Sequence, residues 1–134
     1  MNGVVRPFRA LIVDDCPDST DTLCAPLLAS GVDTQTADCG KIALGKFGEF
    51  QPDMVLIELG MLNLVGASLC ERIRELPTGK DAMLVAVTSF GNDEQHQRCT
   101  LAGFNHYLVK PVDQGCLQLL LNTHAEANGM RLAG

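Results

Sequence analysis

The chain has 134 residues, of which 46% are hydrophobic and 19% charged, and its formal charge is −6 at pH 7. These values predict a single domain over residues 1–134, with its core from about 9 to 127 and flexible ends. The acidic charge argues against nonspecific nucleic-acid binding, and no apolar run approaches the ~20 residues of a membrane span. The start of the chain lacks the apolar core of a signal peptide and the six cysteines are scattered, so we expect reduced thiols and a cytoplasmic location.

Strand-like and helix-like patterns alternate along the chain. The predicted strands span residues 9–13, 33–37, 54–57, 83–87 and 106–109. Four are short apolar runs typical of strands buried on both faces, and the run at 33–37 alternates as an edge strand does. The predicted helices span 17–29, 40–49, 67–76, 93–102 and 113–127. Five such repeats predict an α/β fold, a doubly wound five-stranded parallel sheet with five helices.

Three of the predicted helices carry residues that affect their ends or stability. Pro26 lies inside the helix 17–29, where it removes a backbone donor, so we expect a kink or a broken last turn. Gly45 and Gly48 each weaken the helix 40–49 by ~1 kcal/mol relative to alanine. Gly103 is placed to cap the helix 93–102.

Each apolar strand stops at a polar residue. Asp14 and Asp15 follow the first strand, Glu58 the third, Thr88 the fourth and Lys110 the fifth. Ligands of open parallel α/β sheets bind outside the carboxyl ends of the strands, so these side chains are expected to share one pocket. A carboxylate such as Glu58 at the end of a buried strand requires water, a cation or a donor, and is either a chance feature of the strand end or a site.

This set of residues resembles the receiver domain of two-component response regulators. The resemblance rests on Asp14-Asp15, Gly60-Met61, Gly66, Thr88 and Lys110-Pro111, and it runs from about Arg9 to Thr123. The segment from Gly103 to Asp113 most resembles receivers of hybrid histidine kinases. The resemblance implies a flavodoxin-like fold with strand order 2-1-3-4-5.

The resemblance also implies a weak Mg²⁺ site. In the family the second acid, here Asp15, binds the ion directly, the first acid, Asp14, often binds through water, and the backbone carbonyl at Gly60 supplies another ligand. Mg²⁺ takes one or two carboxylates and keeps several waters, which suits this set. The residues alone also allow a simpler interpretation, in which the two aspartates bind backbone donors at a helix N-terminus.

Three further residues gain roles from the resemblance. In the family the hydroxyl at Thr88 and the ammonium at Lys110 contact the phosphoryl group, Tyr107 is the aromatic switch, and the bond from Lys110 to Pro111 is cis. From the residues alone, Thr88 is equally a β-former, Lys110 a surface lysine and Tyr107 a core residue.

The chain departs from the family in the segment after the third strand. Glu58 stands where the family has the phosphoryl-accepting aspartate, Leu62 where it usually has proline and Val65 where it usually has aspartate. The usual phosphorylation is therefore not expected. Glutamate is one methylene longer than aspartate, so we expect Glu58 within salt-bridge reach of Lys110, biasing the domain only partly toward an active-like state.

These observations leave three classes of function. The first is an atypical, non-enzymatic receiver that binds a histidine kinase, a phosphotransfer protein or a downstream effector, with a homodimer expected through the face built from 93–102, 106–109 and 113–127. The second is a receiver that is still phosphorylated, inefficiently, on Glu58. A flavodoxin-like cofactor carrier or dehalogenase-like phosphatase is weaker, because Asp14-Asp15-Cys16 has neither a hydroxyl-rich phosphate loop nor DxD spacing.

Overall fold

The computed structural model describes residues 7–60, 66–89 and 91–127, and their strands form a parallel sheet in the order β2-β1-β3-β4-β5. The strands are β1 (Arg9–Val13), β2 (Asp33–Ala37), β3 (Met54–Glu58), β4 (Met83–Thr88) and β5 (His106–Val109). The helices are α1 (Pro17–Ala29), α2 (Gly40–Phe50), α3 (Gly66–Glu75), α4 (Asp93–Ala102) and α5 (Gln114–Ala127). The predicted fold class, strand order and alternation are confirmed.

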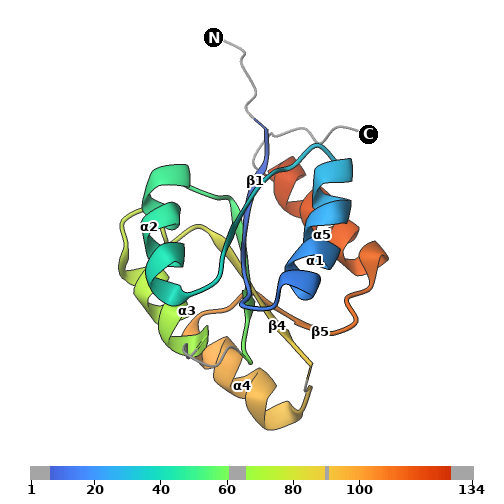
Figure 1. The fold of residues 1–134 in the computed structure, drawn as a ribbon. Coiled ribbons are helices and arrows are strands. Elements are labelled where there is room, and N and C mark those ends of the chain that lie inside the picture. Colours follow the sequence, from blue (N-terminus) through green and yellow to red (C-terminus); the bar gives the residue numbers. More distant parts are fainter. Residues whose placement is uncertain (1–6, 61–65, 90, 128–134) are drawn as a thin grey trace.

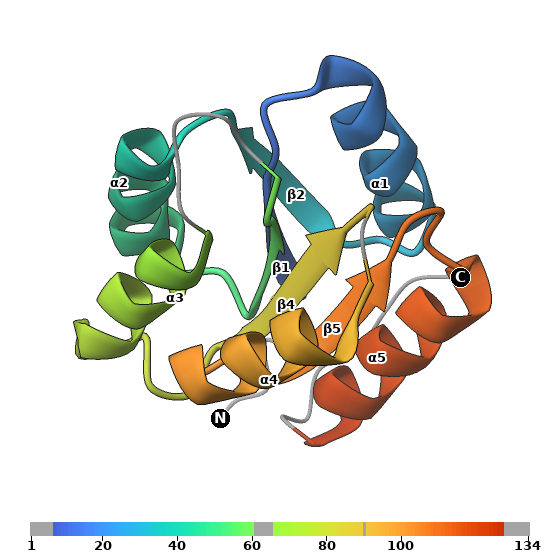
Figure 2. The ribbon, with the colours of Figure 1, turned by 90° about the horizontal axis from the view of Figure 1, so that it is seen from below.

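Helices cover both faces of the sheet. Helices α2, α3 and α4 lie on one face, and α1 and α5 lie side by side on the other (Figures 1 and 2). Alternate residues of the central strands therefore point into two separate cores, which explains why these strands are apolar throughout. The first core includes Leu11, Phe47, Val55, Ile57, Ile73 and Leu84, and the second includes Ile12, Leu27, Leu56, Val85, Leu117 and Leu121.

Helix α1 continues past Pro26 to Ala29. The backbone amide of Ser30 donates to the carbonyls of Pro26 and Leu27, so the last turn is closed and the expected break is absent. Proline removes only its own donor, and burial of Leu23 and Leu27 against the sheet stabilises the turns on either side of it.

Helix α2 forms despite its glycines. Ala43, Phe47 and Phe50 are buried along one side of it, while Gly45 and Gly48 lie on the exposed side. Packing of the apolar side against the sheet thus outweighs the weak helix propensity. Gln51 ends the helix in the left-handed conformation, with φ 51°.

Helix α4 is capped at both ends. Asn92 precedes it and its side chain accepts a hydrogen bond from the backbone amide of Gln95, at 2.8 Å. Gly103 ends it with φ 111°, as predicted. Arg74 of α3 donates to the carbonyls of Gly103 and Ala82 and to the side chain of Asn105, which joins α3 to the segments that precede β4 and β5.

None of the helices formed by the described residues combines the length and the apolar character that crossing a membrane requires.

Candidate functional site

The sheet brings four of the predicted site residues to one edge. Strand β1 pairs with β2 on one side and β3 on the other, so the chain changes direction across the sheet at this point. Glu58 is paired in register with Val87, and Thr88 with Val109. Asp14 and Lys110 come one residue beyond the ends of β1 and β5. The carboxyl ends of the strands therefore lie at one edge of the sheet, and they bring together two acids, a threonine and a lysine: Asp14, Glu58, Thr88 and Lys110.

Asp14 is a buried carboxylate with several donors. Its side chain is 1% exposed. Oδ1 accepts a hydrogen bond from the backbone amide of Cys16 at 2.9 Å, and Oδ2 accepts from the Ser19 hydroxyl at 2.6 Å and from the Lys110 ammonium at 3.1 Å. These donors replace the water that burial removes from the charged group.

Lys110 is the cation that Asp14 and Glu58 share. Its Nζ lies 3.1 Å from Asp14 Oδ2 and 3.4 Å from Glu58 Oε1, and it also donates to the Ser19 hydroxyl. Burial lowers the pKa of this ammonium, but Asp14 and Glu58 raise it by more, so the pKa lies above its ordinary value. Lys110 therefore remains charged at neutral pH. The peptide bond between Lys110 and Pro111 is cis.

Glu58 is the least satisfied group of the pocket. Its side chain is 11% exposed, Oε1 faces Lys110, and Oε2 is buried without a hydrogen-bond partner among the described residues. Burial raises the pKa of the Glu58 carboxyl, Lys110 lowers it, and Asp14 and Asp15 raise it again. The net pKa lies above the ordinary value, so the ion pair with Lys110 does not fully offset the loss of water.

Asp15, next to Asp14, and Gly60, two residues beyond Glu58, are both exposed. A Cβ atom built on Gly60 would lie 3.4 Å from Glu58 Oε1, so the Glu58 carboxylate lies close to this glycine. Across the described ranges, no three histidine, cysteine or acidic side chains are grouped so that they alone could hold a metal ion. A hydrated Mg²⁺ needs few protein ligands, and three groups here still fit it. They are Glu58 Oε2, which has no hydrogen-bond partner among the described residues, the exposed Asp15 carboxylate and the Gly60 carbonyl.

Thr88 and Tyr107 belong to different parts of this edge. Thr88 is 2% exposed, and its carbonyl accepts a hydrogen bond from the backbone amide of Lys110 at 2.7 Å. The Tyr107 hydroxyl instead donates to the Gln95 side chain at 3.0 Å, and its ring stacks on His96 with 4.8 Å between centroids. The aromatic residue is therefore attached to α4, while Asp14 and Glu58 both contact Lys110.

Ser19 is a member of the site that the sequence patterns did not identify. It lies in the first turn of α1, and its hydroxyl joins Asp14 to Lys110. The available signal was a small polar residue in the helix that directly follows an acidic pair. Leu62 and Val65, the two other departures from the family, lie outside the described residues.

Residues 10–122 match the family model of the response regulator receiver domain. The chain belongs to the response regulator receiver family. A relative from Leptolyngbya boryana, an "uncharacterized 14.6 kDa protein in sodA1 3'region", is 36% identical over 103 residues, which are 77% of this chain and 79% of the relative. The fold also matches the receiver domain structure (CheY-like) from Methylobacillus flagellatus with a TM-score of 0.79 and 31% identity, covering 89% of this receiver and 99% of that chain.

This receiver is also similar to part of a much longer protein. It is 35% identical over 116 residues to the sensor histidine kinase RcsC of Salmonella typhi. The match covers 87% of this chain and 12% of RcsC. The predicted similarity to receivers of histidine kinases is therefore confirmed, and it concerns only the aligned 12% of RcsC.

Proposed function

We propose that the chain is an atypical receiver of two-component phosphorelay signalling, a single cytoplasmic module without enzymatic activity in which Glu58 replaces the phosphoryl-accepting aspartate. The observation that carries this proposal is the position of Glu58, which ends β3 with Oε1 3.4 Å from Lys110 Nζ. The extra methylene of glutamate extends the carboxylate toward the lysine, where a phosphoryl oxygen of an ordinary receiver would lie. Any phosphoryl group on Glu58 would then be displaced from its usual position, and a ~1 Å displacement can reduce the rate ~100-fold.

Glu58 can imitate a phosphorylated aspartate only in part. A carboxylate carries one negative charge, whereas a phosphoryl group carries nearly two and offers three acceptor oxygens. Shifting a two-state equilibrium to near completion takes ~5 kcal/mol of differential binding, more than one partly hydrated ion pair supplies. The expected result is that the face formed by α4, β5 and α5 is shifted only partly toward its active-like arrangement.

Asp15, Glu58 and the Gly60 carbonyl would hold Mg²⁺, with Asp14 contacting a metal-bound water. When bound, the ion would neutralise negative charge in the pocket and, in a receiver with a working acceptor, on the phosphoryl oxygens. The protein's own contribution is to keep Lys110 charged and to give the Asp14 side chain three hydrogen-bond donors. Oε2 of Glu58, which is buried and has no hydrogen-bond partner among the described residues, supports this assignment.

The expected partners are a histidine kinase, a phosphotransfer protein or a downstream effector. Exposed apolar side chains on three elements support an interaction surface over α4, β5 and α5. Leu101 of α4 is 87% exposed, Leu119 of α5 is 65% exposed and Val109 of β5 is 44% exposed. A homodimer through this surface is the corresponding proposal for self-association.

A second candidate function is slow phosphorylation of Glu58 itself. Its Oε2 accepts no hydrogen bond from the described residues, so this oxygen keeps its lone pairs for attack on phosphorus. The raised pKa of Glu58 opposes this reaction by lowering the fraction of ionised carboxylate.

Intact-mass measurement after incubation with Mg²⁺ and a small acyl phosphate tests both candidates. The wild-type chain should gain no phosphoryl group on the time scale at which Glu58→Asp gains one. The gain by Glu58→Asp is expected to be incomplete, because Leu62 and Val65 also alter the segment beside the acceptor. Glu58→Gln is the matched control, since it keeps the length of the side chain and removes the nucleophile.

A phosphoryl group on the wild-type chain that disappears in Glu58→Gln would replace the first candidate by the second. A gain that persists in Glu58→Gln would place the acceptor elsewhere and contradict both.

A further inference from the structure

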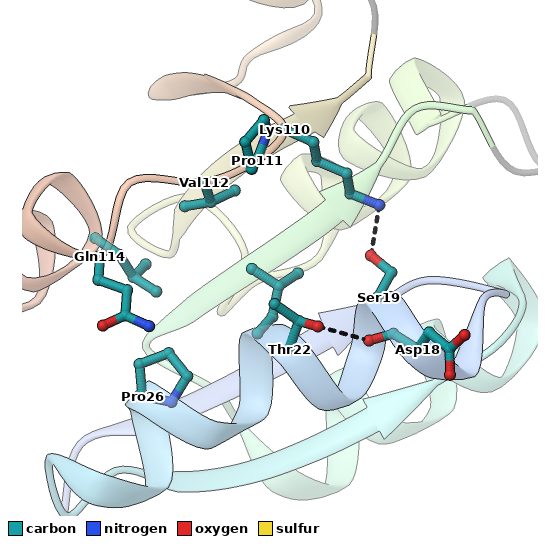
Figure 3. Close-up of a pocket in the computed structure, with 10 residues that line it drawn as sticks. Asp18, Ser19, Thr22, Pro26, Lys110, Pro111, Val112 and Gln114 are labelled. Atoms are coloured by element: carbon teal, nitrogen blue, oxygen red, sulfur yellow. Dashed lines mark hydrogen bonds between the residues drawn. The ribbon is translucent and has the colours of Figure 1, made fainter.

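Ser19 lies between the buried acid and the lysine of the site. Figure 3 shows Ser19 on α1 and Lys110 in the loop after β5 with their polar atoms pointing toward one another. The Ser19 hydroxyl donates to Asp14 Oδ2 at 2.6 Å and accepts a hydrogen bond from Lys110 Nζ at 2.5 Å. A hydroxyl can do both at once, because it has one donor and two acceptor lone pairs.

The three protons of the Lys110 ammonium have three nearby oxygens. Ser19 Oγ lies at 2.5 Å, Asp14 Oδ2 at 3.1 Å and Glu58 Oε1 at 3.4 Å. Hydrogen bonds from an ammonium to a carboxylate are normally about 2.7 to 2.9 Å long, so the contact with Glu58 is stretched. The ammonium therefore lies toward α1, and Glu58 Oε2 is left without a donor among the described residues.

We propose that Ser19 is a positioning residue that holds the Lys110 ammonium toward α1 and thereby limits its pairing with Glu58. Its hydroxyl proton is directed at Asp14, which leaves its lone pairs facing the ammonium. Ser19 and Asp14 thus act together as one acceptor that competes with Glu58 for the same cation. The contact between Ser19 and Lys110 follows from the geometry alone. Its meaning for signalling rests on the proposed function, in which Lys110 neutralises the charge at Glu58.

The chain offers both a rescue variant and a matched control. Ser19 lines a cavity of about 450 Å³ between α1 and the segment 110–117, so the methyl group of Ser19→Thr has room while the hydroxyl is kept. Thr22 lies one turn further along α1 on the same cavity. Its hydroxyl donates to the carbonyl of Asp18 in its own helix, so Thr22→Val removes a neighbouring hydroxyl without touching Lys110.

Crystal structures of the variants test the proposal directly. In Ser19→Ala, the distance from Lys110 Nζ to the nearer oxygen of Glu58 should shorten from 3.4 Å to roughly 2.8 Å. Ser19→Thr and Thr22→Val should keep the wild-type distance. An unchanged distance in Ser19→Ala would overturn the proposal, as would the same shortening in Thr22→Val.

Proton exchange of the Lys110 ammonium, followed by ¹⁵N NMR, gives an independent measurement in solution. Exchange should be several-fold faster in the double variant Ser19→Ala, Glu58→Gln than in Glu58→Gln alone, because the single variant keeps both the Ser19 hydroxyl and Asp14 Oδ2 as acceptors, whereas the double variant has lost the Ser19 hydroxyl. Equal rates in these two proteins would contradict the role of Ser19. Neither measurement uses a phosphodonor or a metal, so phosphorylation of Glu58 would remove the proposed function and leave this inference standing.

Discussion

The ammonium of Lys110 lies 3.4 Å from a carboxylate oxygen of Glu58, across an edge of the sheet where both side chains are largely buried. The same ammonium lies 3.1 Å from Asp14, so one cation serves two acids. Removing one partner of a buried ion pair costs more stability than the pair contributes, because the remaining charge loses both water and its counter-ion. Lys110 is therefore expected to matter for stability as well as for signalling.

Replacing Lys110 with methionine should lower the free energy of unfolding by about 3 kcal/mol at neutral pH. The loss should shrink in acid, where Glu58, whose pKa is raised, becomes protonated and no longer needs a cation. Urea denaturation at pH 7 and at a pH below the ordinary pKa of the carboxyls measures both effects. Lys80→Met is the control, since Lys80 is exposed. Equal losses in the two variants would show that Lys110 has no special electrostatic role.

The raised pKa of Glu58 predicts an unusual pH dependence. Burial makes the folded protein bind the Glu58 proton more tightly than the unfolded chain does. Between the ordinary glutamate pKa and the raised pKa of the folded protein, the folded state binds more protons than the unfolded chain. The contribution of this group to the free energy of unfolding therefore falls as the pH rises through this range. Glu58→Gln lacks the effect. Its stability relative to wild type should therefore increase across this pH range, by at most about 1.4 kcal/mol per pH unit.

Denaturant unfolding of wild type and Glu58→Gln between pH 4 and 8, in the presence of a chelator, measures this difference. A difference that stays constant with pH would mean that the Glu58 carboxyl titrates normally. A difference that falls with rising pH would mean that the ion pair with Lys110 outweighs burial.

The glycines of α2 offer a way to stabilise the protein away from the site. Apart from the neighbouring backbone of α2 itself, no atom of the described residues lies within 4 Å of a Cβ built on Gly45 or Gly48. Alanine should therefore stabilise the protein by about 0.5 to 1 kcal/mol at each position. Gly103→Ala is the opposite control, because φ of 111° and a Cβ contact of 3.3 Å with Arg74 make it strained. Thermal unfolding should show higher midpoints for the first two variants and a lower one for the third.

The fold and much of the site could be predicted because strand patterns are local. Each apolar run ended at the residue that the sheet then placed at its edge, so Asp14, Glu58 and Lys110 were identified without knowledge of their distances. Ser19 was missed because its contact with Lys110 joins residues 91 positions apart. That contact depends on how closely α1 approaches the loop after β5, and no periodicity in the sequence encodes this spacing.

The contacts of Tyr107 illustrate the same limit. Helical periodicity predicted α4 but gave no register between its polar side and β5, so stacking of His96 on Tyr107 could not be foreseen. Pro26 shows a different limit, since a local rule predicted damage to α1 that tertiary packing prevents.

Magnesium binding is the last prediction. The protein ligands proposed for Mg²⁺ are Asp15, Glu58 and the Gly60 carbonyl, and Asp14 already accepts three hydrogen bonds. Titration with Mg²⁺ should shift the NMR signals of residues 14, 15, 58 and 60 first. Asp15→Asn and Glu58→Gln should each weaken binding about tenfold or more, since each removes one of few ligands, whereas Asp81→Asn, an exposed acid before β4, should not. Equal effects of all three variants would reduce the interaction to general attraction of a cation to an acidic protein, and shifts confined to other parts of the chain would remove the metal from this pocket.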